Sequence, residues 1–344
     1  MQYLESDSVR LSEDGRSVII IDQSKLPQKT EYLSLSEPGE LFEAIKQLQV
    51  RGAPAIGIFT GYALAVRARL YCDEGLSDDA FAEAMKKDAE LLCSSRPTAV
   101  NLRHAAEKVM DAAAGLPPKE AAEAARKTAE EIHLKDIEIC RSIAEYGLGL
   151  IKNGSRVITH CNAGALATSR YGTGLGALIL GAERGMELHA YVDETRPLLQ
   201  GARLTAFELQ NAGVDVTLIC DNMAGTLMQQ GKIDACFVGC DRVAKNGDAA
   251  NKIGTLTLAV AAKHFGVPFY VFCPSTTIDT GCGSGRDIVI EERPPEEITE
   301  MFFEKRTSPE GIKCYNPAFD VTDHSLITAI ITENGIFYPP FDLA

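Results

Sequence analysis

This chain of 344 residues contains no tryptophan and has too few basic residues to balance its acidic ones. Lysine and arginine number 34 against 48 aspartate and glutamate residues, which leaves a formal charge of −14. Nucleic acids and anionic membrane surfaces attract basic patches, so this balance argues against nonspecific binding to either. A local group of arginines that binds one phosphate is still compatible with it.

Several signals that would define a protein class are missing. No apolar run approaches the roughly 18 residues of a membrane-spanning helix, and the N-terminal MQYLESDSVRLSEDGR lacks the apolar region of a signal peptide. The ten cysteines form no CxxC pair, which is typical of a protein in the reducing cytoplasm. The histidines are scattered without metal-ligand spacing and no P-loop occurs, so we expect neither a metal nor a cofactor.

The hydrophobic patterns predict two domains. Residues 1–130 are expected to form a mainly helical domain with a short β-sheet. From Ser155, short β-rich runs alternate with helices, which predicts a Rossmann-like α/β domain with a doubly wound parallel sheet over residues 131–344, entered through a bridging helix to about residue 152. The expected strands are 17–22, 31–35, 155–159, 186–192, 214–219, 233–239 and 267–272, and the expected helices are 39–50, 54–75, 77–94, 98–114, 118–152 and 323–333.

The stretch Val238–Thr255 (VGCDRVAKNGDAANKIGT) carries the clearest chemical signal. An apolar strand leads into Asp241, a turn-rich loop follows, and Asn251 and Lys252 are expected at a helix start. Open parallel sheets bind ligands at the carboxyl ends of their strands. Small and apolar neighbours would desolvate Asp241, raise its pKa and keep a proton available. Alternatively, Asp241 caps the turn or pairs with Arg242.

A second strand end carries Cys161, with an expected helix beyond it. A thiol near a helix N-terminus is favoured as the thiolate, which would make Cys161 a usable base. The alternative is a buried and inert cysteine. His160 is an unfavoured partner for Cys161, because adjacent strand residues point to opposite faces of a sheet.

Two expected helix starts carry an arginine next to a glycine or a proline, at Arg51 and Arg96. Backbone amides, the helix dipole and a guanidinium group can converge on a phosphate there, although each turn alone is also typical of an ordinary interhelical connection. Gln200 follows strand 186–192 and is placed to bind a sugar hydroxyl. Polar loops, the one at Asp221 among them, thus follow four successive expected strands. Such strand ends form the crevice in which α/β sheets bind ligands.

The segment Gly172–Ala177 (GTGLGA) matches the GxGxxA dinucleotide pattern, with Asp193 about 20 residues further on. That fingerprint should follow the first strand directly, whereas here it lies well beyond strand 155–159. We therefore expect these glycines to let a helix pack closely on the sheet, rather than to bind NAD.

Long, ordered blocks of the chain resemble the methylthioribose-1-phosphate isomerase family of the methionine salvage pathway. Its superfamily includes ribose-1,5-bisphosphate isomerases and the regulatory subunits of eukaryotic translation initiation factor two B. Cys240 departs from the family pattern, which has a small residue such as alanine there. The matching blocks are RGAPAIG (51–57), SRPTAVNL (95–102), THCNAGALAT (159–168), DETRPLLQGARLTAFEL (193–209), DNMAG (221–225), GCDRVAKNGDAANKIGT (239–255) and NPAFDVT (316–322).

The resemblance implies a cofactor-free isomerisation of 5-methylthioribose 1-phosphate to 5-methylthioribulose 1-phosphate by a homodimer. On matching positions, Asp241 is the proton donor, and Cys161 is the partner acid/base or stabilises charge. The implied substrate contacts are Arg51, Gly52, Ala53, Arg96, Gln200, Asn251 and Lys252.

Three other functions stay open. A related isomerase would act on 5-deoxyribose 1-phosphate or ribose 1,5-bisphosphate; the few cations in the motif loops favour an apolar pocket for the C5 substituent over a second phosphate site. A noncatalytic regulatory subunit is disfavoured by the joint presence of Cys161 and Asp241. A plain nucleotide-binding module is disfavoured by the misplaced glycine motif.

Overall fold

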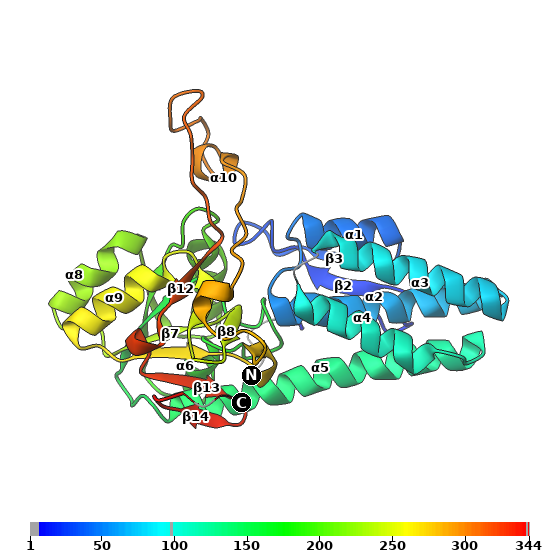
Figure 1. Ribbon diagram of the computed structural model, residues 1–344, viewed down its shortest axis with the longest axis horizontal. Helices are drawn as coiled ribbons and strands as arrows, with labels where there is room; N and C mark the ends of the chain where they lie inside the picture. Colours follow the sequence, from blue (N-terminus) through cyan, green and yellow to red (C-terminus); the bar gives the residue numbers. More distant parts are fainter. Residues whose placement is uncertain (1–6, 97–98, 342, 344) are drawn as a thin grey trace. The chain divides into compact units, whose positions relative to one another are not determined.

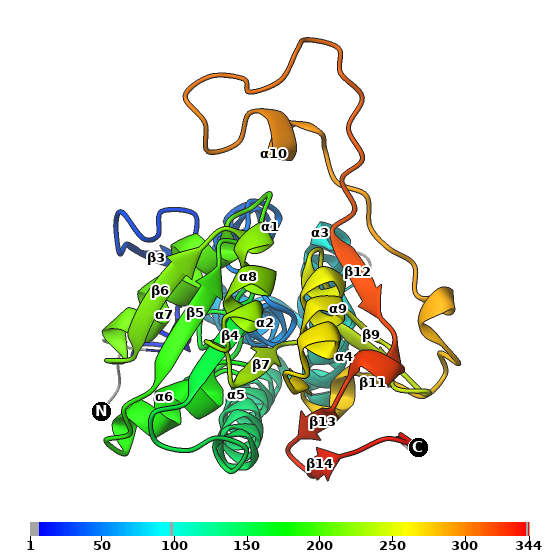
Figure 2. The same ribbon diagram turned by 90° about the vertical axis from the view of Figure 1, so that its left-hand side faces the viewer.

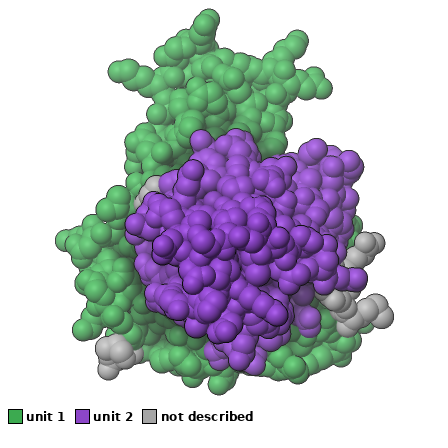
Figure 3. Space-filling model, turned by 90° about the vertical axis from the view of Figure 1, so that its right-hand side faces the viewer, with its two compact units in different colours: residues 1, 139–164, 171–344 green, residues 2–138, 165–170 purple. Residues whose placement is uncertain are grey.

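The computed structural model describes residues 7–96, 99–341 and 343, so part of the N-terminal segment lies outside the described residues. The chain divides into two compact units, coloured separately in Figure 3. The unit that we call the helical unit contains residues 2–138 and 165–170. The other, the sheet unit, contains residues 1, 139–164 and 171–344.

The helical unit combines a small antiparallel sheet with a group of helices (Figure 1). The two expected strands and five expected helices of this region are confirmed to within a few residues. The additional strand β1 is absent from the sequence prediction because three residues are too short for a readable pattern. The elements are β1 (Val9–Leu11), β2 (Val18–Ile21), β3 (Tyr32–Leu35), α1 (Pro38–Lys46), α2 (Ala53–Asp73), α3 (Asp78–Ser95), α4 (Val100–Ala113) and α5 (Pro118–Leu148).

Helix α2 forms the centre of this unit, since residues on every side of it are buried between Ala55 and Ala68. Its one buried charge, Arg67, is compensated by Asp88 of α3, whose carboxylate lies 2.9 Å from the Arg67 Nε. The Tyr71 hydroxyl also donates to Asp88 at 2.9 Å. A buried ion pair with further hydrogen bonds avoids the cost of an isolated buried charge.

The sheet unit is built on a seven-stranded sheet in the order β14-β13-β10-β7-β4-β5-β6. All its strand pairs are parallel except β13 with β14. The five strands expected in this region are confirmed. The strands are β4 (Arg156–His160), β5 (His189–Asp193), β6 (Asp215–Ile219), β7 (Ala235–Val238), β10 (Phe269–Phe272), β13 (Ala329–Thr332) and β14 (Gly335–Phe337).

Helices lie on both faces of this sheet. Residues of α8 and α9 share a buried cluster with Ile158, Val238 and Val271. On the opposite face, α5 approaches the ring of Phe272 so closely that a Cβ at Gly147 would lie 2.6 Å from it. The helices are α6 (Gly176–Glu183), α7 (Ala206–Asn211), α8 (Ala224–Gln229), α9 (Thr255–Phe265) and α10 (Glu296–Thr299), the last on an arm that extends away from the sheet (Figures 1 and 2).

A second, four-stranded sheet in the order β11-β8-β9-β12 corrects the sequence prediction. Asn251 and Lys252 lie on β9, and not at a helix start, because α9 begins at Thr255. The turn Lys245–Asp248 therefore closes a hairpin between β8 and β9. The strands are β8 (Arg242–Ala244), β9 (Ala249–Lys252), β11 (Ile278–Asp279) and β12 (Phe319–Thr322).

The helix expected at 323–333 is wrong. This segment forms a short 3-10 turn, His324–Leu326, followed by β13. All four residues of β13 are buried, so its sequence AIIT is a continuous apolar run that periodicity cannot distinguish from a buried helix. Among the described residues, no helix has both the length and the apolarity needed to cross a membrane.

Candidate active site

Cys161 follows β4 directly and adopts a left-handed backbone conformation with φ of 65°. Such a conformation is costly for a residue with a side chain and persists where surrounding contacts impose it. Two threonines supply these contacts: the Cys161 amide donates to Thr195 Oγ1 at 2.9 Å, and Thr205 Oγ1 donates to the Cys161 carbonyl at 2.6 Å. The position of the thiol is therefore set by loops that come from elsewhere in the sheet unit.

The expected helix after Cys161 is wrong. Residues 162–175 form turns, and α6 begins only at Gly176, so the helix dipole argument for a thiolate does not apply. The chain doubles back here because Gly172 has φ of 81° and lies so near Gly164 that a Cβ would be 2.3 Å from its Cα. A Cβ at Gly174 would lie 2.9 Å from the amide of Gly239. These glycines therefore do permit close approach, but not of a helix to the sheet as expected: Gly172 and Gly174 lie in the loop before α6, and a Cβ at Gly176 would lie 2.9 Å from Ala144 of α5.

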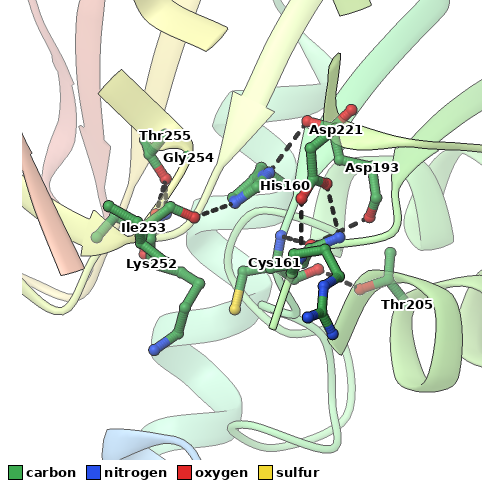
Figure 4. A network of polar contacts seen from close by, with 12 residues as sticks. His160, Cys161, Asp193, Thr205, Asp221, Lys252, Ile253, Gly254 and Thr255 are labelled. Carbon is green, nitrogen blue, oxygen red and sulfur yellow. Dashed lines mark hydrogen bonds and ion pairs between the residues drawn. The ribbon is translucent and has the colours of Figure 1, made fainter. Parts of the chain in front are cut away.

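His160 does not face the thiol. Its Nδ1 lies 3.0 Å from Asp193 Oδ2, its Nε2 lies 2.8 Å from the carbonyl oxygen of Ile253, and Figure 4 shows the Cys161 sulfur directed away from the ring. Burial raises the pKa of Asp193 to about 6. Burial by itself would lower the pKa of His160, but the hydrogen bond to Asp193 and its charge outweigh this and raise it. In a dinucleotide-binding motif, Asp193 would bind a ribose hydroxyl. Here its carboxylate is bonded to His160 within the protein.

Asp241 follows β7 by three residues, and its amide donates to the carbonyl of Ala250 at 2.9 Å. Asp241 is exposed, which differs from the desolvated position expected from its small and apolar neighbours. Arg242 forms an ion pair with Asp279 at 3.6 Å. Cys240, where the family pattern has a small residue, directs its thiol at the carbonyls of Arg242 and Ala250, and burial raises its pKa.

Cys161 and Asp241 follow neighbouring strands at the centre of the sheet. β4 and β7 are parallel, and His160 is the register partner of Val238. The chain runs from β4 outward through β5 and β6, and then returns to β7 on the other side of β4. Such a reversal is a topological switch point, where α/β sheets bind their ligands.

Asn251 and Lys252 extend from β9 in the same unit. The Asn251 side-chain amide donates to Thr255 Oγ1 at 3.0 Å, so it stabilises the start of α9. The Lys252 ammonium donates to the carbonyl of Ala318 at 2.9 Å and lies 4.2 Å from the centre of the Phe319 ring. Figure 4 shows that the Lys252 ammonium and the Cys161 thiol extend toward the same side of the network.

Gln200 is buried, and its Oε1 has no hydrogen-bond partner among the described residues. A buried polar atom without a partner is costly and marks a place where a ligand can bind. Gln200 precedes one turn of π-helix, Gly201–Thr205, a feature often found at functional sites. A Cβ at Gly201 would lie 1.7 Å from the carbonyl oxygen of Asp193, so only glycine fits in this turn.

The other predicted contacts, Arg51, Gly52, Ala53 and Arg96, lie in the helical unit. Gly52 precedes α2 with φ of 94°, and a Cβ there would lie 2.4 Å from the carbonyl oxygen of Ala167. The Ala55 amide donates to that same oxygen at 3.1 Å. Arg96 follows the last residue of α3, and the Pro97 and Thr98 of its motif lie outside the described residues.

Sequence reasoning assigns no role to the polar residues that hold Cys161. Asp221 accepts from the backbone amides of Thr195 and Arg196, each at 2.7 Å, and thereby holds the loop after β5. Asn162 donates to Glu208 at 2.7 Å. A threonine or an acid just beyond a strand end was the available signal, but it does not say which neighbouring loop the side chain will contact.

Within the part of the chain that the structure describes, two groups of side chains have the composition of a metal site: His160 with Asp193 and Asp221, and Asp248 with Asp323 and His324. In the first group, Asp193 and Asp221 already accept hydrogen bonds from the protein. In the second, burial by itself would raise the pKa of Asp248, but hydrogen bonds from the Asn246 side-chain amide and from the backbone amides of Gly285 and His324 outweigh it and lower the pKa to about 2. We interpret both groups as hydrogen-bonding networks that hold loops together.

Residues 49–339 match the Initiation factor 2 subunit family. A methylthioribose-1-phosphate isomerase of Symbiobacterium thermophilum is 53% identical over 97% of this chain and 94% of its own length. A 5-deoxyribose 1-phosphate isomerase of Clostridium botulinum (strain Okra) is 48% identical over 97% of this chain and 96% of its own.

Two crystal structures have the same fold over nearly the whole chain. The 5-methylthioribose 1-phosphate isomerase of Pyrococcus horikoshii is 39% identical, with a TM-score of 0.93 over 99% of this chain and 95% of that one. The translation initiation factor eIF-2B, subunit delta, from A. fulgidus is 43% identical, with a TM-score of 0.90 over 98% of this chain and 97% of that one. Since the family match covers most of its residues, the chain belongs to the Initiation factor 2 subunit family.

Proposed function

We propose that this chain is an aldose–ketose isomerase that converts 5-methylthioribose 1-phosphate to 5-methylthioribulose 1-phosphate in methionine salvage. The observation that carries the proposal is the placement of a thiol and a carboxylate, Cys161 and Asp241, after two adjacent parallel strands at the switch point of the sheet. The identity of 53% to a methylthioribose-1-phosphate isomerase supports the substrate.

The reaction needs two groups that handle protons. Phosphate on the anomeric oxygen prevents free opening to an aldehyde, so the ring oxygen must be protonated as the furanose opens. Hydrogen must then move from C2 to C1, either by proton transfer through an enediol-like intermediate or as a hydride. General acid and base steps of this kind each contribute roughly 10²- to 10⁴-fold to a rate.

We assign Asp241 to protonation of the ring oxygen and Cys161 to the proton at C2; in a hydride shift, Cys161 would instead stabilise charge. Lys252 extends to the same side as the Cys161 thiol, which supports a role in steadying negative charge on the substrate oxygens. Gln200 offers a buried Oε1 that no described residue contacts by a hydrogen bond, which supports a contact to a sugar hydroxyl. We also propose that Asn251 contacts the substrate, because it precedes Lys252 on β9.

For the phosphate we propose Arg51, Gly52, Ala53 and Arg96. Gly52 and Ala53 open the long helix α2 without a side-chain cap, so their amides are suited to an anion. An arginine adds charge-assisted hydrogen bonds, which are about twice as strong as neutral ones. No metal or cofactor is part of the proposed chemistry.

The second candidate substrate is 5-deoxyribose 1-phosphate, because a relative named for that activity is 48% identical. The two substrates share the reacting C1 and C2 and differ at C5 alone. An assay with both substrates present at equal concentration shows which of the two has the higher kcat/KM. If neither sugar phosphate is converted, a noncatalytic role as a regulatory subunit would be left; the A. fulgidus protein of the same fold is named as a subunit of a translation initiation factor.

We further propose a cytoplasmic homodimer, with a helical domain at 1–130 and a catalytic domain at 131–344. The division of the chain within α5 supports the two domains. We assign the sheet to the Rossmann-like, doubly wound class, since its strand order reverses at β4 and helices lie on both faces. Sedimentation of the purified protein tests the homodimer.

Phosphorus NMR of the protein with 5-methylthioribose 1-phosphate tests the function. We expect the anomeric phosphate signal to be replaced by that of a primary-alcohol phosphate, and Cys161→Ser and Asp241→Asn to abolish this change. Cys220→Ser and Asp215→Asn, which alter exposed groups of the same unit, are the matched controls. No conversion by the wild-type protein would contradict the function; activity in both site variants would contradict the residue assignment alone.

A further inference from the structure

We propose that His160 is a positioning residue that holds Cys161 and Lys252 in a fixed relation through hydrogen bonds at both ends of its imidazole ring. The inference rests on the proposed function, because it takes Cys161 and Lys252 as groups that act on the substrate. His160 itself does not act on the reacting atoms, since both its nitrogens are bonded within the protein.

The first bond fixes the state of the ring. A backbone carbonyl accepts hydrogen bonds only, so Nε2 must carry a proton to bind the oxygen of Ile253 at 2.8 Å. At the other end, Nδ1 and Asp193 Oδ2 are 3.0 Å apart and need one proton between them. The pair is therefore either imidazolium with carboxylate or imidazole with carboxylic acid, and both forms are neutral overall. A neutral pair suits a site in which both side chains are almost completely buried.

The Asp193 end of the ring connects to Cys161. The Thr195 hydroxyl donates to the backbone carbonyl of Asp193 at 3.0 Å and accepts from the Cys161 amide at 2.9 Å. Asp221, after β6, holds the amide of Thr195. Three strand ends are thus joined around His160, and the left-handed backbone of Cys161 depends on them.

The Ile253 end connects to Lys252, its neighbour in the chain. Ile253 and Gly254 form the bend between β9 and α9, and Gly254 has φ of 105°. A Cβ at Gly254 would lie 2.7 Å from Cε1 of His160, so the bend lies directly against the ring. Asp320 holds the far side of the bend by accepting from the Gly254 amide at 2.7 Å. Loss of the His160 bond would free the side of the bend that carries Lys252.

Two substitutions separate the two bonds. In His160→Gln, the amide can reach Ile253 but not Asp193; in His160→Asn, it can reach Asp193 but not Ile253. We expect each to lower kcat by about 10- to 100-fold with KM changed less than about 3-fold, since a small misplacement of reacting groups costs this much. His189→Gln, which removes a His–Asp pair at the other end of β5, is the matched control and should keep the wild-type kcat.

A second pair of variants distinguishes the loss of a hydrogen bond from the loss of the folded structure. In Asp193→Asn, the amide can donate to Nδ1 of the Nε2-protonated ring, so we expect kcat within about 3-fold of wild type. Asp193→Ala removes the partner of Nδ1 and should lower kcat as His160→Gln does, since both lose the bond to Asp193 and keep the one to Ile253. Wild-type kcat in folded His160→Gln and His160→Asn would overturn the proposal, as would equal losses in Asp193→Asn and Asp193→Ala.

Absence of turnover by the wild-type protein would count against the proposed function alone. The proposal about His160 is then tested by the rate at which iodoacetamide alkylates Cys161. Mass spectrometry of the peptide that contains Cys161 measures this rate. We expect this rate to change more than about 3-fold in His160→Gln and His160→Asn and to stay unchanged in His189→Gln. An unchanged rate in all three variants would overturn the proposal.

Discussion

The hydroxyl of Thr205 donates a hydrogen bond of 2.6 Å to the backbone carbonyl of Cys161, although the two residues are 44 positions apart in the chain. Thr205 is completely buried and also accepts from the Asn162 side-chain amide at 3.2 Å. The contact links the π-helical turn after β5 to the end of β4. It makes the conformation of Cys161 a property of the sheet unit as a whole.

Thr205→Val should therefore affect both stability and activity. The substitution keeps the shape of the side chain but removes the hydroxyl that donates to the partly buried Cys161 carbonyl, which costs about 1–3 kcal/mol. We expect the free energy of unfolding in urea to fall by this amount and kcat to fall about tenfold. Thr205→Ser keeps the hydroxyl and is the control. Equal stability of the Val and Ser variants would show that the hydrogen bond has no such role.

Arg51→Lys should weaken substrate binding in preference to the chemical step. Lysine keeps the charge but loses the planar, bidentate guanidinium. We expect KM for the sugar phosphate to rise about 10- to 100-fold, with kcat within a few-fold of wild type, in steady-state kinetics. Arg16→Lys, at an exposed ion pair with Asp73 in the same unit, should leave both constants unchanged. An unaltered KM in Arg51→Lys would remove this arginine from the phosphate site.

Gly201→Ala should be among the more destabilising single-methyl additions in the sheet unit. The new Cβ would lie 1.7 Å from the carbonyl oxygen of Asp193, so the backbone would have to shift. We expect a loss of about 3 kcal/mol in the free energy of unfolding. In Gly225→Ala, on α8, the nearest atom to the new Cβ lies at 4.0 Å, and a gain of about 0.5–1 kcal/mol is expected. Similar stabilities for the two variants would contradict the close approach at Gly201.

The Asp193–His160 pair should make the folded state less stable as pH rises. The folded pKa of Asp193 is raised from 3.8 to about 6, and that of His160 is raised above 6.5. Folded protein thus binds protons more tightly than unfolded protein, so the added stability is present at acid pH and is lost as pH rises through these folded pKa values. The loss amounts to about 1.4 kcal/mol for each unit by which a folded pKa exceeds its unfolded one.

Urea unfolding of wild-type protein and of Asp193→Asn between about pH 5 and pH 8 measures this effect. We expect the free energy of unfolding to fall more steeply with pH in the wild-type protein. Asp221 and Glu194 also face the Asp193 carboxylate, and Asp320 faces His160, so the difference between the two proteins, and not either curve alone, isolates the pair. Parallel curves would contradict the upward pKa shifts.

Much of the fold was predictable because it depends on local patterns. The helices of the helical unit have apolar residues at helical spacing over many turns, and the β-rich runs that alternate with helices indicate a parallel sheet. The missed strands share one physical cause, the lack of a pattern that can be read locally. Short strands such as β8, β9 and β13 depend on their neighbours for hydrogen bonds, and a buried run such as AIIT has no periodicity to read.

The sequence by itself determined the helices of the helical unit, the parallel strands, and the residue types at each strand end, Cys161 and Asp241 among them. These follow from composition, spacing and chain order, which are local properties. Only the tertiary structure decided the environments of those residues: the exposure of Asp241, the left-handed backbone of Cys161 and the bonds of His160 to Asp193 and Ile253. The partners in these contacts lie 33 to 93 positions apart in the chain, and the register of the sheet brings them together.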